Sequence, residues 1–135
     1  MPITISAAKT ITLDQVLPLY KANFWSAAEK PDELLAALRN SHALITAWDN
    51  TRLVGLGNAI SDGHLVVYYP HLLVLPHYHG QGIGRKIMDR LQQLYQDFHM
   101  QMLTADADAI EFYQKMGFEK AGQTQPMWIY AGGEH

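Results

Sequence analysis

The segment from Leu72 to Leu94 places three glycines between an apolar run and an amphipathic run. Gly80, Gly82 and Gly84 alternate with other residues in "HGQGIGR". The start of a helix offers unpaired N–H groups and the positive end of its dipole, and both favour an anion. Alternating glycines let such N–H groups converge on one ligand without a Cβ in the way. The segment therefore predicts a phosphate-binding loop, and the alternative is a tight strand-to-helix turn.

Two common phosphate motifs do not fit this loop. A P-loop requires Lys and then Ser or Thr after its last glycine, whereas Arg85 and Lys86 follow here. A dinucleotide-binding loop has G-x-G-x-x-G in the first βαβ unit and an acidic residue ~20 positions later. Here the glycine spacing differs, Met102 lies near that position, and the loop falls in the second half of the chain.

Two segments carry a resemblance to a known family. "VLPHYHGQGIGRKIM" (74–88) resembles the central motif of the GNAT superfamily of acyl-CoA-dependent N-acetyltransferases. "DADAIEFYQKMGF" (106–118) resembles the second motif of that family, in the right order and spacing. Two positions depart from the motifs. His79 replaces the usual Arg or Gln, and Asp106 replaces the usual Asn. The Asp106 side chain keeps a capping oxygen but lacks the amide donor of Asn.

The resemblance implies acetyl-CoA as the co-substrate. The main chain of one strand would pair with the pantetheine arm as if it were an added strand. The N–H groups of residues 79–85 would hold the pyrophosphate. The charge of Arg85 would neutralise phosphate, although Arg85 and Lys86 are equally typical of a solvated helix face. The implied binding residues are Leu73, Val74, His79, Gly80, Gln81, Gly82, Ile83, Gly84, Arg85 and Asp106.

The chemistry implied is direct attack of a neutral amine on the thioester, since the chain has no cysteine nucleophile. By resemblance Tyr113 is the general acid, with an ordinary pKa of ~10 near the ~8.5 of a thiol. We take His71 as a candidate base because imidazole titrates near neutrality; simple packing or a water chain are the alternatives. His71, His77 and His79 lack a carboxylate partner at a recognised spacing, so no metal site is expected.

The acceptor is expected to be a primary amine, either on a small molecule or on a protein. Tyr20, Phe24 and Trp25 lie in the segment where the resemblance places the substrate, and they favour an aromatic or aliphatic amine. Core packing explains them equally well. A competing hypothesis is a non-catalytic acyl-CoA-binding or protein-interaction module on the same fold.

Composition indicates one compact domain over residues 1–135. The 135 residues are 48% hydrophobic, with a net charge of −3 and no basic block, so we expect no nucleic-acid partner. The first residues lack a signal peptide, and no apolar run reaches the ~20 residues that span a bilayer. We expect a cytoplasmic protein that does not bind membranes, either monomeric or a homodimer.

The elements that must position these residues follow from patterning. The expected fold is a mixed α/β GNAT-type domain, with a mostly antiparallel sheet flanked by helices. Pro18 is expected to kink or end the first helix, and Asp106 and Gly117 to cap the last one. Strands are expected at 3–5, 43–48, 52–60, 65–75 with a break at Pro70, 100–104, 119–122 and 127–130, and helices at 13–25, 30–41, 83–98 and 106–118.

Overall fold

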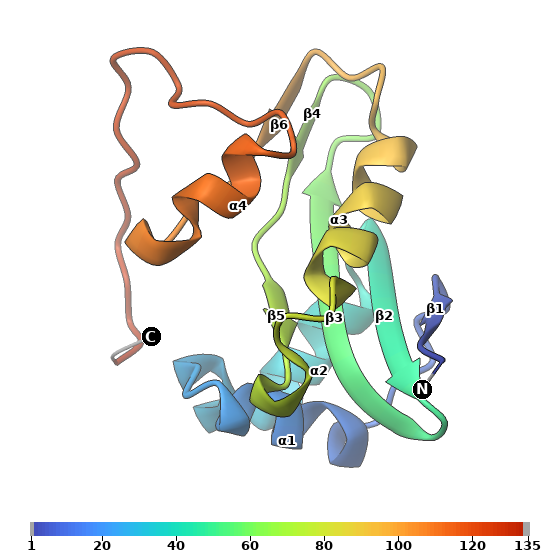
Figure 1. Ribbon diagram of the computed structural model, residues 1–135. Helices are drawn as coiled ribbons and strands as arrows, with labels where there is room; N and C mark the ends of the chain where they lie inside the picture. The colour runs from blue at the N-terminus through green and yellow to red at the C-terminus, as the bar shows by residue number, and fades with distance from the viewer. Residues whose placement is uncertain (1, 134–135) are drawn as a thin grey trace.

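A computed structural model describes residues 2–133, which form a six-stranded mixed sheet with helices on both faces (Figure 1). This confirms the predicted fold class. In chain order the strands and α-helices are β1 (Thr4–Ser6), α1 (Leu13–Ala22), α2 (Pro31–Arg39), β2 (Ala43–Asp49), β3 (Arg52–Ser61), β4 (Val66–Tyr68), β5 (Leu72–Val74), α3 (Ile83–Leu94), β6 (Met100–Met102) and α4 (Ile110–Gln114). Short 3-10 helices are η1 (Ser26–Glu29), η2 (Pro76–Tyr78) and η3 (Ala107–Ala109).

The sheet has the order β1-β2-β3-β4-β6, with β5 also paired to β3. All pairs are antiparallel except β4 with β6. β4 pairs with the end of β3 and β5 with its middle, so the predicted break at Pro70 is confirmed. Because β6 pairs with β4 but not with β5, the sheet diverges after this break. That divergence leaves the outer edge of β5 without a neighbouring strand among residues 2–133.

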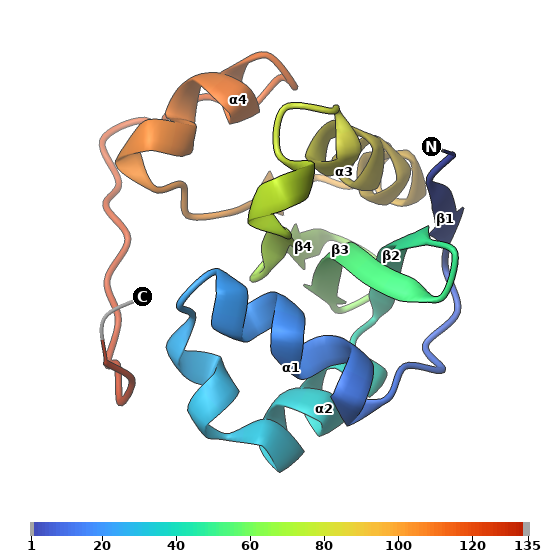
Figure 2. The same cartoon turned by 60° about the horizontal axis from the view of Figure 1, so that its bottom comes forward.

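The helices bury their apolar stripes on opposite faces of the sheet, as Figure 2 shows. Close packing of α3 depends on the glycines of β3: a Cβ at Gly57 would lie 2.8 Å from Ile87 Cγ2. On the other face α1 and α2 contribute buried residues such as Leu19, Tyr20 and Leu38. The buried stripe of α3 is Ile83, Ile87, Met88 and Leu91.

The structure differs from the sequence-based expectations at three places. Pro18 lies inside α1 without ending it, since the proline is exposed and water can satisfy the freed carbonyl. Asp106 makes no side-chain capping bond; only its carbonyl accepts the N–H of Ala109, at 2.9 Å. Residues 119–122 and 127–130 form no strand, because within the described chain they have no neighbouring strand to pair with.

Candidate functional site

The glycine loop lies between β5 and α3 and has the geometry of an anion site. Gly80 and Gly82 have φ of 79° and 78°, a region that side chains other than glycine rarely adopt. A Cβ at either position would meet no atom within 4 Å, so the space beside the loop is open. No side chain caps α3 at Gly82, and Lys86 makes the first bond back to Gly82. The N–H groups of residues 83–85 therefore have no acceptor within the helix.

The main-chain N–H of His79 is not available to a phosphate, contrary to the expectation. Its backbone N–H donates to the carbonyl of Pro76 at 3.1 Å, so it is already used. Its ring Nε2 lies 2.8 Å from the carbonyl oxygen of Val74 and ties the loop to β5. The amide groups that can face a phosphate are consequently those of residues 80–85.

Tyr78 anchors the loop to the hairpin of β2 and β3. Its hydroxyl donates to Oδ2 of Asp49 at 2.6 Å, and this bond raises the pKa of the phenol. The guanidinium of Arg52 lies over the Tyr78 ring, 5.8 Å from its centroid. Sequence reasoning missed this anchor, because the pair is far apart in the chain and only the aromatic residue belongs to the motif.

The outer edge of β5 exposes main-chain groups of alternate residues. His71 accepts from β3 through its carbonyl, and Leu75 donates to β3 through its N–H. Between them Leu73 must also face β3, where it pairs with Leu56. The prediction that the main chain of Leu73 pairs with a pantetheine arm is therefore corrected. Leu72 and Val74 have the alternate direction and face the open edge.

The second motif lies against this loop through Phe112 of α4. The tip of its ring is 3.6 Å from the position of a Cβ at Gly84, which is an ordinary van der Waals distance, so α4 packs against the first turn of α3. Tyr113 follows, with its ring 5.0 Å from that of Phe112 and 6.0 Å from that of Phe118. Burial and, secondarily, the charge of Asp106 raise the pKa of Tyr113 to about 12. Its hydroxyl is therefore a hydrogen-bond donor at neutral pH.

His71 lies at the junction of β4 and β5 and is held by two elements. Its ring Nδ1 is 2.7 Å from the hydroxyl oxygen of Tyr20, and its main-chain N–H donates to Oδ1 of Asn58 at 3.0 Å. The ring of Trp25 meets the imidazole edge-on, with centroids 5.0 Å apart. Two residues expected to line the amine pocket thus contact the candidate base directly.

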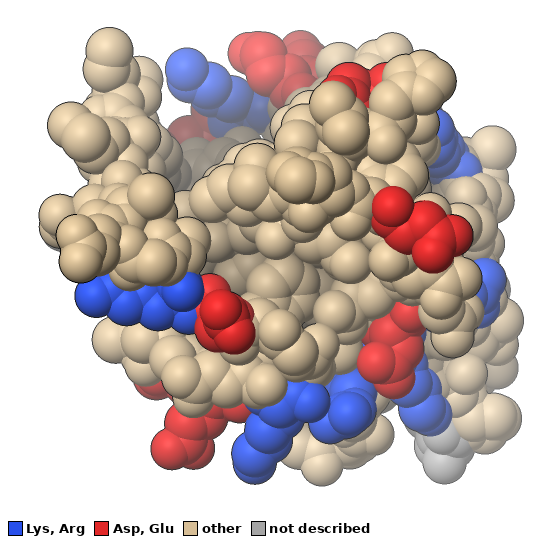
Figure 3. Space-filling view, turned by 90° about the horizontal axis from the view of Figure 1, so that it is seen from above, with Lys and Arg blue, Asp and Glu red and all other residues tan. Residues whose placement is uncertain are grey.

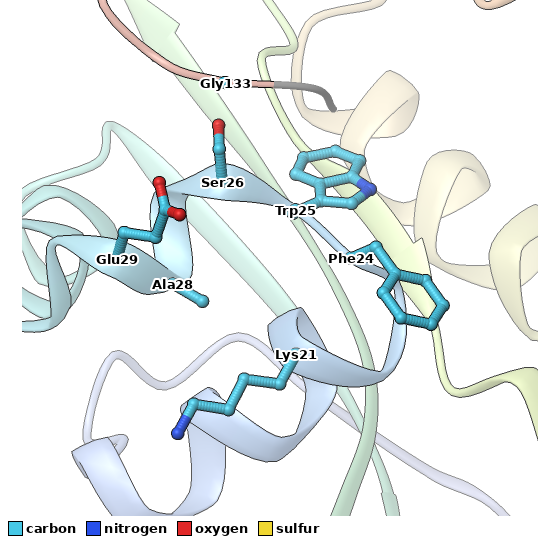
Figure 4. Close-up of a pocket in the computed structure, with 7 residues that line it drawn as sticks. All are labelled: Lys21, Phe24, Trp25, Ser26, Ala28, Glu29 and Gly133. Carbon is cyan, nitrogen blue, oxygen red and sulfur yellow. The ribbon is translucent and has the colours of Figure 1, made fainter.

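Trp25 also lines a cavity of about 380 Å³ (Figure 4). The rings of Phe24 and Trp25 lie on one side of the view, and the charged ends of Lys21 and Glu29 on the other. Phe24 is 84% exposed and has a φ of 59°, which is costly for a bulky side chain. The lining residues are Lys21, Phe24, Trp25, Ser26, Ala28, Glu29 and Gly133.

Comparison with known proteins agrees with this geometry. Residues 7–127 match the family described as the acetyltransferase (GNAT) domain. The chain belongs to the GNAT acetyltransferase family. Membership supports acyl transfer as its activity.

Individual relatives differ in how far they extend beyond the matched region. A GNAT-family acetyltransferase structure from Streptococcus pneumoniae is 32% identical, has a TM-score of 0.83, and is matched over 96% of this chain and 99% of its own. The uncharacterized N-acetyltransferase ycf52 of Pyropia yezoensis is 28% identical over 87% of this chain and 71% of its own length. Histone acetyltransferase TAP1 of Glycine max is 32% identical over 64% of this chain, which spans only 43% of that protein.

Two kinds of site are not found in the described part of the chain. Residues 2–133 contain no helix long and apolar enough to cross a membrane. Within the same residues no group of three or more His, Cys, Asp or Glu side chains is placed to hold a metal ion.

Proposed function

We propose that this GNAT protein transfers an acetyl group from acetyl-CoA to a primary amine by direct attack. One observation carries the proposal: the open edge of β5 leads directly into a loop whose amides at 80–85 are available to an anion, beside the helix of Tyr113. A chain of amides joined to a diphosphate matches such a continuous series of main-chain groups.

The residues present fit acetyl-CoA. Leu72 offers its main-chain N–H and carbonyl on the open edge to the pantetheine amides. Val74 offers its N–H, because its carbonyl already accepts from the side chains of Asn23 and His79. Residues 80–85 offer N–H groups to the pyrophosphate. Arg85 and Lys86 are exposed at the start of α3, where their charge neutralises phosphate. Acetyl-CoA supplies the activated thioester when bound. The charge of Asp106 helps to raise the pKa of Tyr113 and so keeps this phenol protonated.

Tyr113 stabilises the leaving sulfur by hydrogen bonding. Its pKa of about 12 lies above the ~8.5 of a thiol, so complete proton transfer from the phenol to a thiolate is uphill. A donated hydrogen bond still stabilises charge that develops on sulfur in the transition state. The role is therefore that of a donor whose proton is retained, or shared only transiently.

His71 accepts the proton of the amine, and its tautomer decides which ring atom does so. When Nδ1–H donates to the oxygen of Tyr20, the lone pair lies on Nε2, and Nε2 is then the basic atom. Burial holds the pKa of the Tyr20 phenol well above its usual value, so this residue keeps its proton and does not compete as a base. The aromatic side chains of Trp25 and Phe24 favour an amine with an apolar body.

The experiment is release of free CoA from acetyl-CoA with a panel of aromatic, aliphatic and peptide amines. We expect release with at least one amine, and a much larger loss of kcat than of acetyl-CoA affinity in Tyr113→Phe. Tight acetyl-CoA binding without release for any amine, in both the wild type and Tyr113→Phe, would favour the non-catalytic binding module instead.

A further inference from the structure

The helix that carries Tyr113 has little burial of its own. α4 has 5 residues, and none of its side chains is fully buried. Phe112 and Tyr113 are only partly buried where they pack against the core. A helix this short gains little stability from its own backbone hydrogen bonds. The direction of the Tyr113 side chain must therefore depend on the contacts that α4 makes with larger elements.

The larger element beside α4 is α3. In both ribbon views α4 lies next to α3 and to one side of the sheet (Figures 1 and 2). Seen from above, the surface is hollowed between the C-terminal segment on the left and the body of the molecule (Figure 3). By contrast, α3 is packed tightly on β3 through Ile87 and Leu91, which approach Gly57. α3 is thus a fixed support against which α4 can be held.

The end of α4 is built around the main chain of Tyr113. The Tyr113 carbonyl accepts the N–H of Met116 at 3.0 Å and that of Phe118 at 3.1 Å. The N–H of Gly117 donates to the carbonyl of Gln114 at 3.1 Å. The bonds from residues 117 and 118 form a Schellman motif, for which Gly117 supplies the positive φ, 97°. This motif does not use the carbonyl of Met116.

Gln92 of α3 binds that carbonyl. Its side-chain Nε2 donates to the carbonyl oxygen of Met116 at 3.0 Å. The contact of Phe112 with Gly84 lies near the start of α3, eight residues earlier or about 12 Å along the helix. Two contacts this far apart fix both the tilt and the rotation of α4. Tyr113 lies between them in the chain, so together they fix its place.

We propose that Gln92 is a positioning residue for Tyr113, because it holds the end of α4 against α3. This inference rests on the proposed function, in which the Tyr113 hydroxyl donates to the leaving sulfur. Such a bond requires a set distance and angle, and a displacement of about 1 Å lowers a rate strongly. The pyrophosphate is held at the opposite end of α3. Loss of the Gln92 bond should therefore affect turnover more than acetyl-CoA affinity.

Gln92→Met tests this assignment, because it keeps the length of the side chain and removes the donor. We expect kcat to fall about tenfold, while acetyl-CoA affinity changes much less. Gln93→Met is the matched control, since Gln93 is the next residue of α3 and is exposed, and it should have the kcat of the wild type. Gln92→Lys restores a donor and should recover much of the rate. Equal kcat for Gln92→Met and Gln93→Met, or no recovery in Gln92→Lys, would overturn the proposal.

A double substitution shows whether Gln92 acts through Tyr113. Two residues that serve the same interaction have effects that do not add. In the Tyr113→Phe background, Gln92→Met should therefore lower kcat little further. A further loss as large as the one in the wild type would mean that Gln92 supports the protein only generally, and the proposal would be wrong.

Fluorine nuclear magnetic resonance tests the same contact without turnover. In protein labelled with fluorotyrosine, the Tyr113 signal is the one that disappears in Tyr113→Phe. We expect this signal to move in Gln92→Met and to stay in place in Gln93→Met. A Tyr113 signal that does not move in Gln92→Met would overturn the proposal. A moved signal in a protein that releases no CoA with any amine would contradict the proposed function, yet it would support the positioning of Tyr113 by Gln92.

Discussion

The hydroxyl oxygen of Tyr20 lies 2.7 Å from Nδ1 of His71, which joins α1 to the junction of β4 and β5. Tyr20 is fully buried, whereas His71 is only partly buried beside Trp25. Nδ1 of the imidazole is therefore held at the core, while the ring lies beside Trp25, where the acceptor amine is proposed to bind. Tyr20 is a positioning residue for the proposed base, because its hydroxyl holds Nδ1 of the imidazole in place.

Tyr20→Phe should change the pH dependence of kcat/KM more than it changes acetyl-CoA affinity. Loss of the hydroxyl leaves Nδ1 without this partner, costs about 1–3 kcal/mol of stability, and shifts the acidic limb of the pH–rate profile. His71→Ala should remove that limb and lower the rate at neutral pH.

A second tyrosine–histidine pair provides the matched control. The Tyr95 hydroxyl lies 2.6 Å from Nδ1 of His42, far from the proposed acceptor site. Tyr95→Phe should lower the melting temperature by a similar amount and leave the acidic limb unchanged. Equal shifts of the limb in both variants would show that Tyr20 acts through general stability alone.

Gly82→Glu should abolish acetyl-CoA binding, as measured by calorimetry. The substitution brings a negative charge to the loop and forces a side chain onto a backbone with φ of 78°. Gly122→Glu is the control for strain, because Gly122 has a φ of 61° and open space around it in the C-terminal segment. Both variants should lose roughly 1–2 kcal/mol of stability, but only Gly82→Glu should lose the ligand. Similar acetyl-CoA affinity in the two variants would show that the loop does not bind the cofactor.

Tyr113 should remain protonated through the alkaline range in which most enzymes are assayed. Its folded-state pKa is raised, from ~10 when unfolded to about 12, so the stability that it contributes is present below pH ~10 and is lost toward pH 12. No alkaline decline of kcat below pH ~10 should depend on Tyr113. The profiles of wild type and Tyr113→Phe, scaled to their maxima, should coincide there. A wild-type decline that is absent in Tyr113→Phe would contradict the raised pKa.

Asp106→Asn should lower the pKa of Tyr113, because the carboxylate charge is one of its two causes. Tyrosinate absorbance followed against pH, with the Tyr113→Phe curve subtracted, measures that pKa. We expect a shift toward the ordinary value but not to it, since burial is the larger cause and persists. An unchanged curve would mean that Asp106 does not act on Tyr113 electrostatically.

The features that were predicted well from the sequence are those that depend on residues close together in the chain. The glycine loop and the apolar stripe of α3 follow from local spacing, so their positions were predictable. The direction of the Leu73 main chain depends on the register with β3, which no local pattern determines. The anchor between Tyr78 and Asp49 depends on the same long-range pairing.

The C-terminal segment shows most clearly what a local sequence pattern does not determine. Residues 127–130 have strand-forming side chains, yet a strand also needs a neighbour, and the described chain places none beside it. Propensity alone therefore overestimated the number of strands.

The most direct test of the central claim follows the backbone amides themselves as CoA is added. In an amide nuclear magnetic resonance titration, we predict the largest shifts at residues 80–85, with the downfield direction of amides that donate to phosphate. The His79 amide, already bonded to Pro76, should move less. Saturable CoA binding that leaves residues 80–85 unshifted would contradict the account.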